Sequence, residues 1–198
     1  MSKTKRPKRD GELDQYFTRD DVARACVKML PIQPGELVLE PHAGGGAFTR
    51  ALRAEHPEAI VFANDKDFGQ VGSWGVPPGH ITRCDFLEMQ SDPVNYCYHW
   101  IVGNPPYNEA EAHIRKALQL APNVAFLLRA GLMTPLKREG LRREFPVDEF
   151  HLLAPRPPFG DTMSVDGTEY ALHVWRQDWR RRHPNHERTF SIIEWRGQ

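Results

Sequence analysis

Apolar residues follow two spacings along the chain, and these spacings predict strands and helices in turn. Short apolar runs rich in β-branched residues predict buried strands, while apolar residues three or four positions apart predict helices. Strands are expected at 37–39, 60–63, 81–84, 100–103, 124–129, 150–154 and 170–175. Helices are expected at 19–30, with Thr18 as the N-cap, and at 46–53, 109–121 and 137–144. The alternation predicts an α/β fold, a mostly parallel sheet with helices on both faces and an antiparallel edge formed by the last two strands.

The length and composition are those of one globular domain. The chain has 198 residues, of which 40% are hydrophobic and 26% charged, which is typical of a soluble folded protein. Residues 1–12 are polar and charged without periodicity, so a flexible basic arm is expected there. The domain itself is expected over 13–176. A basic, Trp-containing extension over 177–198 is expected to pack on or near that domain.

Apolar runs and cysteines indicate the compartment. The longest apolar stretches, such as 124–128, are too short to cross a bilayer, and no apolar run follows the basic N-terminus as in a secretory signal. The cysteines are odd in number and have no paired spacing: Cys26, Cys84 and Cys97. We therefore expect a reduced cytoplasmic protein without disulfides or a metal site, and Cys84 and Cys97 are expected in the core.

The charges balance in number but are unevenly distributed. Lys and Arg number 26 and Asp and Glu number 26, so the formal net charge is zero. Residues 1–9 carry five basic residues and no acid, and 176–188 carry five arginines. Basic ends around an acidic middle are consistent with contact to a polyanion, although a solvated tail explains the same counts.

A glycine cluster marks the first candidate site. Gly44, Gly45 and Gly46 stand between a predicted strand and a predicted helix, where glycines let the backbone approach a ligand at the helix N-terminus. Asp65 ends the next strand, 21 positions after Gly44, the separation at which nucleotide-binding sheets place a carboxylate on ribose hydroxyls. The G-x-G-x-x-G fingerprint is not met, because Thr49 occupies its last position.

The second candidate site is the tetrapeptide 104–107, Asn-Pro-Pro-Tyr, which follows the strand predicted at 100–103. Asn104 presents a side-chain carbonyl and Pro105 a backbone carbonyl, and the two prolines stiffen both. Two convergent acceptors suit a planar amino group, and Tyr107 can stack on the ring that carries it. A rigid turn capped by an aromatic residue is the alternative interpretation.

Together the two motifs resemble the S-adenosylmethionine-dependent amino methyltransferases, especially the DNA N6-adenine methyltransferases of small phage and bacterial type. The resemblance spans about 13–176 and includes the closing segment from Arg156 to Trp175. It implies a Rossmann-like class I methyltransferase fold with a seven-stranded, mostly parallel sheet and one antiparallel strand. It also implies that 13–176 is the catalytic domain and that S-adenosyl-L-methionine is the cofactor. The sequence departs from the family at Arg19, usually proline, and at His42, usually an aromatic or small residue.

The resemblance assigns roles residue by residue. Methyl transfer would involve Asn104, Pro105, Pro106 and Tyr107. The cofactor would be held at its methionine end by Gln15, Tyr16, Phe17 and Thr18, along the first strand and glycine loop by Glu40, Pro41, Ala43, Gly44, Gly46 and Phe48, and at its ribose and adenine by Asp65, Asp85 and Phe86.

The implied partner is nucleic acid, with DNA favoured over RNA. Phosphate contacts are expected from the basic arm, from Lys3 to Arg9, and from basic residues in two runs: Lys137, Arg138, Arg142 and Arg143, and Arg180, Arg181 and Arg182. Because no segment is long enough for a separate recognition domain, we expect short or relaxed sequence specificity.

An RNA adenine methyltransferase and a catalytically idle nucleic-acid-binding module stay open as alternatives. Release-factor glutamine methyltransferases carry an extra N-terminal helical region for which this chain has no room. The sequence leaves monomer and homodimer open.

Overall fold

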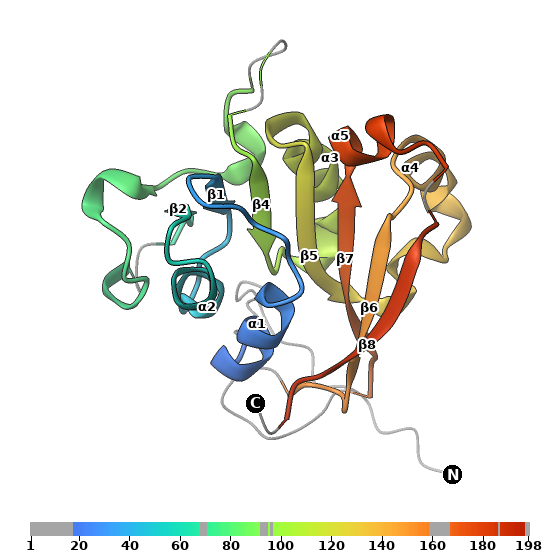
Figure 1. Cartoon of the computed structure of the whole chain (residues 1–198), viewed down its shortest axis with the longest axis horizontal. Helices are drawn as coiled ribbons and strands as arrows, with labels where there is room; N and C mark the ends of the chain where they lie inside the picture. The colour runs from blue at the N-terminus through green and yellow to red at the C-terminus, as the bar shows by residue number, and fades with distance from the viewer. Residues whose placement is uncertain are drawn as a thin grey trace.

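The computed structural model describes residues 18–67, 71–91, 95, 97–158, 167–185 and 187–196, and these form one eight-stranded sheet. The strand order is β3-β2-β1-β4-β5-β7-β6-β8. The strands are β1 (Leu37–Glu40), β2 (Ile60–Asn64), β3 (Ile81–Thr82), β4 (Trp100–Gly103), β5 (Asn123–Arg129), β6 (Glu149–Ala154), β7 (Tyr170–Arg176) and β8 (Thr189–Glu194). The helices are α1 (Asp20–Val27), α2 (Ala47–Glu55), α3 (Ala110–Leu120), α4 (Glu139–Glu144) and α5 (Gln177–Arg182). Helices lie on both sides of the sheet, α1 in front of it and α3 behind it in Figure 1.

Strand directions confirm a mostly parallel sheet and correct its edge. β7 is antiparallel to both of its neighbours, β5 and β6, whereas the other pairings of the sheet are parallel. β7 therefore lies inside the sheet, not at the edge where the sequence placed an antiparallel strand. The edge strand on this side of the sheet is β8, which pairs with β6 and was not predicted. β8 brings residues of the C-terminal extension into the same sheet.

The core lies around the central strands. The five residues from Val124 to Leu128 have no exposed surface, and the flanking Trp100 and Trp175 are at most 2% exposed. Strands covered on both faces are apolar throughout, which explains why these runs were readable as strands. Within the described part of the chain, no helix is both long and apolar enough to cross a membrane.

The start of α1 differs from the prediction. The N-cap is Arg19, whose side chain makes no capping hydrogen bond, and the helix begins at Asp20. Thr18 does not cap it, because its hydroxyl accepts a hydrogen bond of 3.1 Å from Asn104 Nδ2, from a residue 86 positions away. The Thr18 hydroxyl, which the local sequence assigned to the start of α1, thus binds the distant Asn104.

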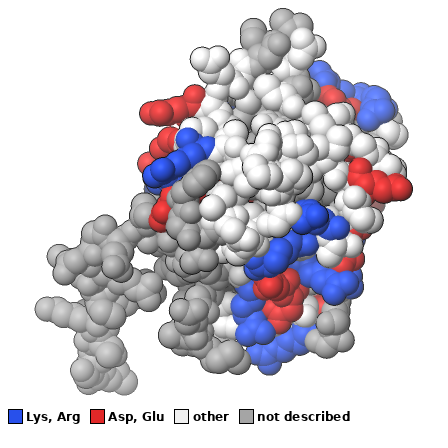
Figure 2. Space-filling view, turned by 90° about the vertical axis from the view of Figure 1, so that its left-hand side faces the viewer, with Lys and Arg blue, Asp and Glu red and all other residues white. Residues whose placement is uncertain are grey.

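Ion pairs join α1 to α2. Arg24 pairs with Glu55, and Arg50 pairs with Asp20 at 2.5 Å. On the face shown in Figure 2, much of the surface carries no charged group, and the Lys and Arg groups near its lower edge alternate with Asp and Glu. As far as the described residues extend, this face lacks the continuous basic surface typical of nucleic-acid contact.

A buried histidine predicts how stability changes with pH. His173 on β7 is fully buried between Phe150 and Trp175, and this burial lowers its pKa to about 4 despite the hydrogen bond to the Ala171 carbonyl. Between that value and the pKa of an unfolded-chain histidine near 6.5, only the unfolded state takes up the proton. Stability is therefore present above pH 6.5 and is lost as the pH falls.

Replacing this histidine removes that dependence. From pH 7 to pH 4, the free energy of unfolding of the wild type should fall by about 3 kcal/mol more than that of His173→Phe. Urea unfolding at several pH values measures the difference. The contributions of other titrating groups to the free energy of unfolding are the same in both proteins and cancel. Equal losses in both proteins would show that His173 is protonated in the folded state.

Candidate functional site

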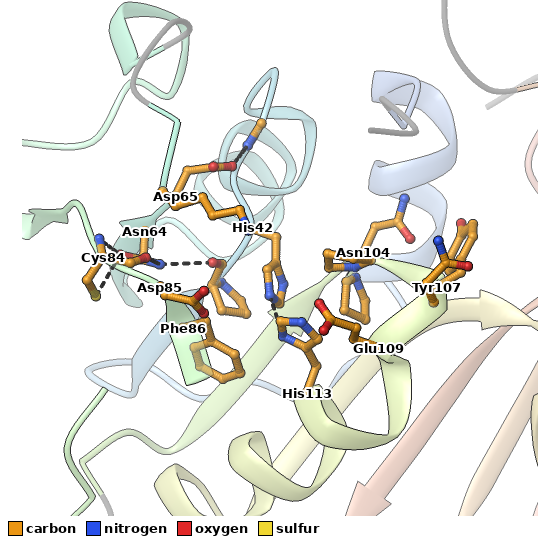
Figure 3. Close-up of a pocket in the computed structure, with 16 residues that line it drawn as sticks. His42, Asn64, Asp65, Cys84, Asp85, Phe86, Asn104, Tyr107, Glu109 and His113 are labelled. Carbon is orange, nitrogen blue, oxygen red and sulfur yellow. Dashed lines mark hydrogen bonds between the residues drawn. The ribbon is translucent and has the colours of Figure 1, made fainter. Parts of the chain in front are cut away.

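A cavity of about 420 Å³ opens at the carboxyl edge of the sheet, where the loops after β1, β2 and β4 meet (Figure 3). This is the size of a small-molecule site, roughly 300–1,000 Å³. In open α/β sheets ligands bind at this edge. Its lining includes most of the residues that the sequence assigned to chemistry: Pro41, Gly44, Asp65, Asp85, Phe86, Asn104, Pro105, Pro106 and Tyr107.

The glycine loop after β1 is fixed from two sides. On the cavity side, Gly44 N donates to Asp65 Oδ2 at 2.8 Å, which joins the loop to the end of β2. On the outer side, Trp74 Nε1 donates to the Gly44 carbonyl at 2.8 Å. Gly46 is the N-cap of α2 with φ of +79°, and a Cβ there would lie 2.9 Å from Trp74 Cδ1. The loop therefore requires glycine, for its backbone conformation and for space.

Glu40 ends β1 inside the protein. Its side chain is 2% exposed, and its Oε2 atom has no hydrogen-bond partner among the described residues. Burial, reinforced by the nearby Asp65, raises the pKa of this carboxyl well above its usual range. Glu40 lines a small cavity of about 40 Å³ together with Thr18, Ala43, Phe48 and Asn104. An unpaired buried carboxyl of this kind suits a cationic or amino ligand group.

Asn64 holds the ends of three strands together. Its Nδ2 donates to the carbonyls of Pro41 and Cys84, both at 3.1 Å. Its Oδ1 accepts from Cys84 N at 3.1 Å and from Thr82 Oγ1 at 3.0 Å. The side chain is 1% exposed and thus sets the cavity wall from inside. Cys84 is half-buried in that wall and Cys97 is exposed, so the expectation that both lie in the core was wrong.

The adenine-binding segment assigned from the sequence follows β3. Asp85 Oδ1 accepts from Leu87 N at 3.0 Å, which turns the chain so that its side chain and Phe86 face the cavity (Figure 3). Phe86 is parallel to the His113 ring, with centroids 5.8 Å apart. The apolar ring beside a carboxylate is suited to a purine that bears an amino group.

A histidine pair forms the floor of the cavity. His42, after β1, and His113, on α3, approach to 2.9 Å between Nε2 and Nδ1. Burial is the main cause that lowers the pKa of both rings. The pKa of His42 is lowered further by the neighbouring His113. Both rings are therefore neutral at neutral pH, and in this state one ring nitrogen donates the hydrogen bond and the other accepts it.

The tetrapeptide 104–107 leads from β4 toward α3. Asn104 Nδ2 is held by the Thr18 hydroxyl, which leaves Oδ1 as the acceptor end of this amide. Pro105 and Pro106 line the cavity beside it, and Tyr107 begins a short 3₁₀ turn. The Tyr107 ring is 6% exposed, packs 5.6 Å from the Tyr170 ring, and has the Arg129 guanidinium 5.4 Å above it.

The two basic runs lie in different places. Lys137 and Arg138 line a cavity of about 420 Å³ on the outer side of Asn108 and Glu109. Arg142 instead donates to the carbonyls of Met133 and Pro135 and so holds the loop after β5, while Arg143 is exposed on α4 without lining a described cavity.

The structure does not bring the second run to the site. Because β7 is antiparallel to β5, α5 follows at the opposite edge of the sheet, where Figure 1 shows it. Arg180 is bound to Asp148 and to the Pro146 carbonyl, and Arg181 pairs with Asp178. Arg182 donates to the Asp178 carbonyl. Residues 180–182 therefore do not border the cavity, contrary to the arrangement proposed from charge.

Some assigned residues lie outside the described part of the chain, and some contributors were not assigned. Gln15, Tyr16, Phe17 and the basic arm fall in the first group. The second group comprises Asn64, Lys66, Asn108, Glu109 and His113, together with His42 and Cys84. The rule that ligands gather after strand ends would have found the first three, whereas His113 on α3 has no local signal. Among the described residues, no three His, Cys, Asp or Glu side chains gather to hold a metal.

No protein-family model matches the chain. Over 135 residues it is 30% identical to ribosomal RNA small subunit methyltransferase A of Nitratidesulfovibrio vulgaris strain Hildenborough, which covers 64% of this chain and 49% of that protein. The chain thus spans about half the length of the curated relatives it matches. PH1948 of Pyrococcus horikoshii, a candidate RNA methyltransferase, superimposes with a TM-score of 0.67 at 17% identity, covering 83% of this chain and 88% of that one. The type I restriction enzyme EcoKI M protein superimposes with a TM-score of 0.59 at 16% identity, covering 83% and 44%.

These likenesses confirm the expected Rossmann-like methyltransferase fold, with eight strands in place of seven. The two cavities, which share His42, Gly44 and Asn104, also fit the cofactor that the fold implies. In the small cavity the unpaired Glu40 oxygen suits an amino group, and in the larger one Asp65 and Asp85 suit hydroxyl and amino groups. The chain is thus similar to ribosomal RNA small subunit methyltransferase A over part of its sequence and to methyltransferases in its fold, and S-adenosylmethionine is the cofactor that this fold implies.

Proposed function

We propose that this protein is an S-adenosylmethionine-dependent methyltransferase that acts on the exocyclic N6 amino group of adenine in DNA. One observation carries the proposal. The Asn-Pro-Pro-Tyr segment lies at the wall of the same cavity as the acidic groups at the ends of β2 and β3, so acceptors for an amino group stand beside a nucleoside-sized pocket. When bound, the cofactor supplies an activated methyl group on its sulfonium.

The segments around β1 and β2 hold the cofactor in this proposal. Glu40 receives the amino group of the methionine part, and the glycine loop lets the backbone approach it. Asp65 accepts from the ribose hydroxyls and Asp85 from the adenine amino group, while Phe86 packs against the adenine ring. The His42–His113 pair closes the floor under these groups and, being neutral, adds no charge next to the sulfonium.

Asn104 and Pro105 act on the substrate amino group. The lone pair of the adenine amino nitrogen is delocalised into the ring, which makes it a poor nucleophile. Oxygen acceptors at Asn104 Oδ1 and the Pro105 carbonyl hold the two N–H hydrogens and favour a more tetrahedral nitrogen as the N–C bond forms. This is positioning with electrostatic stabilisation, without a covalent enzyme intermediate.

Tyr107 supports the base once it leaves the stack. An adenine within a duplex must leave its stack before N6 can reach the cavity, and an aromatic ring at the pocket wall offsets part of that cost. Tyr107 is fixed by the Tyr170 ring and the Arg129 guanidinium, so little conformational freedom is lost on stacking.

RNA is the second candidate, because the curated relative at 30% identity is named for ribosomal RNA. DNA is preferred because the Asn-Pro-Pro-Tyr segment resembles the DNA enzymes. Transfer of a radiolabelled methyl group to double-stranded DNA, single-stranded DNA and RNA of one sequence separates the two. Faster transfer to DNA is expected, and faster transfer to RNA would replace the DNA assignment. A short or relaxed recognition sequence is part of this proposal, and sequencing of the methylated product tests it.

A further inference from the structure

A second cavity, of about 370 Å³, shares Tyr107 with the cofactor cavity. It is lined by Tyr107, Arg129, Arg138, Thr168 and Glu169, and we name it the Arg129 cavity. Arg129 is the last residue of β5, and β5 is parallel to β4, so this guanidinium and the Asn104 segment emerge at the same edge of the sheet. The sequence predicted phosphate contact for Arg138 but gave Arg129 no role.

The two cavities have opposite electrostatic character. Among the described residues, the cofactor cavity is lined by three carboxylates, Asp65, Asp85 and Glu109, and by one Lys or Arg side chain, Lys66. The Arg129 cavity has two guanidinium groups against the carboxylate of Glu169, which is itself paired with Arg156 at 2.5 Å. A phosphodiester is therefore repelled from the first cavity and attracted to the second.

Anchoring of the guanidinium groups favours a bound phosphate. Arg138 Nη1 donates to the Leu132 carbonyl at 2.5 Å, and the Arg129 guanidinium lies over the Tyr107 ring at 5.4 Å. Arginine forks that are already oriented lose less entropy when they bind phosphate oxygens. Arg138 also lines the neighbouring cavity with Lys137, so basic groups continue around the 3₁₀ turn from Tyr107 to Glu109.

We propose that the Arg129 cavity binds the phosphate of the nucleotide that flanks the target adenine, with Arg129 as its ligand. This inference rests on the proposed function, since it assumes that an adenine reaches the cofactor cavity past Tyr107. Because Tyr107 lines both cavities, a base held in the cofactor cavity would leave its adjacent phosphodiester next to the Arg129 cavity. The polymer is thus recognised next to the base by charge, without base-edge contacts.

The test measures binding without methyl transfer. Fluorescence anisotropy follows a labelled single-stranded DNA oligonucleotide with one adenine, in the presence of S-adenosylhomocysteine. Arg129→Gln should weaken binding roughly 10-fold and lower the slope of log Kd against log salt by about 1. Arg129→Lys keeps the charge and should keep most of the salt slope. The matched control is Arg188→Gln, an exposed residue just before β8 at the opposite edge of the sheet, which should bind like the wild type.

An uncharged linkage tests the same contact from the substrate side. One methylphosphonate replaces the phosphate on the 5′ or the 3′ side of the adenine, which leaves the protein unchanged. At one of these two positions it should weaken wild-type binding roughly 10-fold and cause no further loss with Arg129→Gln. Independent, multiplying losses would overturn the proposal, as would wild-type binding by Arg129→Gln or no oligonucleotide binding at all.

The outcomes keep the two proposals apart. If no polymer is methylated but binding depends on Arg129 and on the flanking phosphate, the methyl-transfer assignment fails and the phosphate site stands. If methylation proceeds and Arg129→Gln binds and reacts like the wild type, the phosphate site fails and the methyl-transfer assignment stands.

Discussion

Replacing Asn104 by alanine is expected to lower kcat for methyl transfer by roughly 10²- to 10³-fold or more, the usual loss when one preorganised hydrogen-bonding group of an active site is removed. The amide is the side chain best placed to accept from the substrate amino group, since its Nδ2 is held by the Thr18 hydroxyl at 3.1 Å. Alanine removes the acceptor and leaves the cofactor contacts of Glu40 and Asp65 in place. The Kd for S-adenosylmethionine should therefore stay close to that of the wild type.

Single-turnover kinetics and calorimetric titration of the cofactor measure the two quantities separately. Asn123→Ala is the matched control, because Asn123 begins β5 at the opposite edge and donates to the His99 carbonyl at 3.0 Å. It should turn over like the wild type. An Asn104→Ala protein that binds cofactor and turns over normally would refute the role of the amide.

Replacing Glu40 by glutamine is expected to weaken S-adenosylmethionine binding by roughly 10- to 100-fold, since a hydrogen bond to a charged group contributes about 1.5–3 kcal/mol. Glu40 is buried and its Oε2 atom has no partner among the described residues, so we expect the cofactor amino group to be the cation that binds this carboxylate. Glutamine keeps the shape of the side chain and removes its charge.

The pH dependence of binding has a definite sign. In the free protein the pKa of Glu40 is raised well above its usual range, chiefly by burial, so the carboxyl holds a proton over pH values at which an exposed glutamate is ionised. An ammonium partner favours the ionised form, so binding releases that proton and tightens as the pH rises. The amino group of the cofactor titrates in the same way when either protein binds it. The difference in the pH dependence of binding between the wild type and Glu40→Gln therefore reports the titration of Glu40.

Calorimetry in two buffers of different ionisation enthalpy counts the released protons. The wild type should release more protons than Glu40→Gln at the pH values where free Glu40 is protonated. Glu58→Gln, an exposed residue before β2 at the far edge, is the control and should match the wild type. Equal proton release by wild type and Glu40→Gln would show that Glu40 does not meet the cofactor amino group.

The parts of the fold that are dictated locally were readable from the sequence. β1, β4 and β5 are buried on both faces, so their apolar runs stand out, and the glycine and proline segments that follow them are fixed by backbone conformation. Both candidate motifs could therefore be placed at one sheet edge before the structure was known.

What escaped prediction depends on distant parts of the chain. The Thr18 hydroxyl serves Asn104 instead of α1, and His42 meets His113 across 71 positions. β8 is a half-exposed edge strand with Phe190 and Ile192 on its surface, so its pattern lacks the buried run that marks a strand. Residues 180–182 were misplaced although an antiparallel strand before them already implied the opposite edge of the sheet.

The identity of the methylated atom tests the central claim most directly. The full chain is incubated with S-adenosylmethionine that carries a deuterated methyl group and with the best polymer substrate, which is then digested to nucleosides and analysed by mass spectrometry. We expect the label on N6 of adenine, and its loss with Asn104→Ala. Label on a cytosine amino group, on a ring carbon or on protein, or no label on any DNA or RNA, would contradict the account.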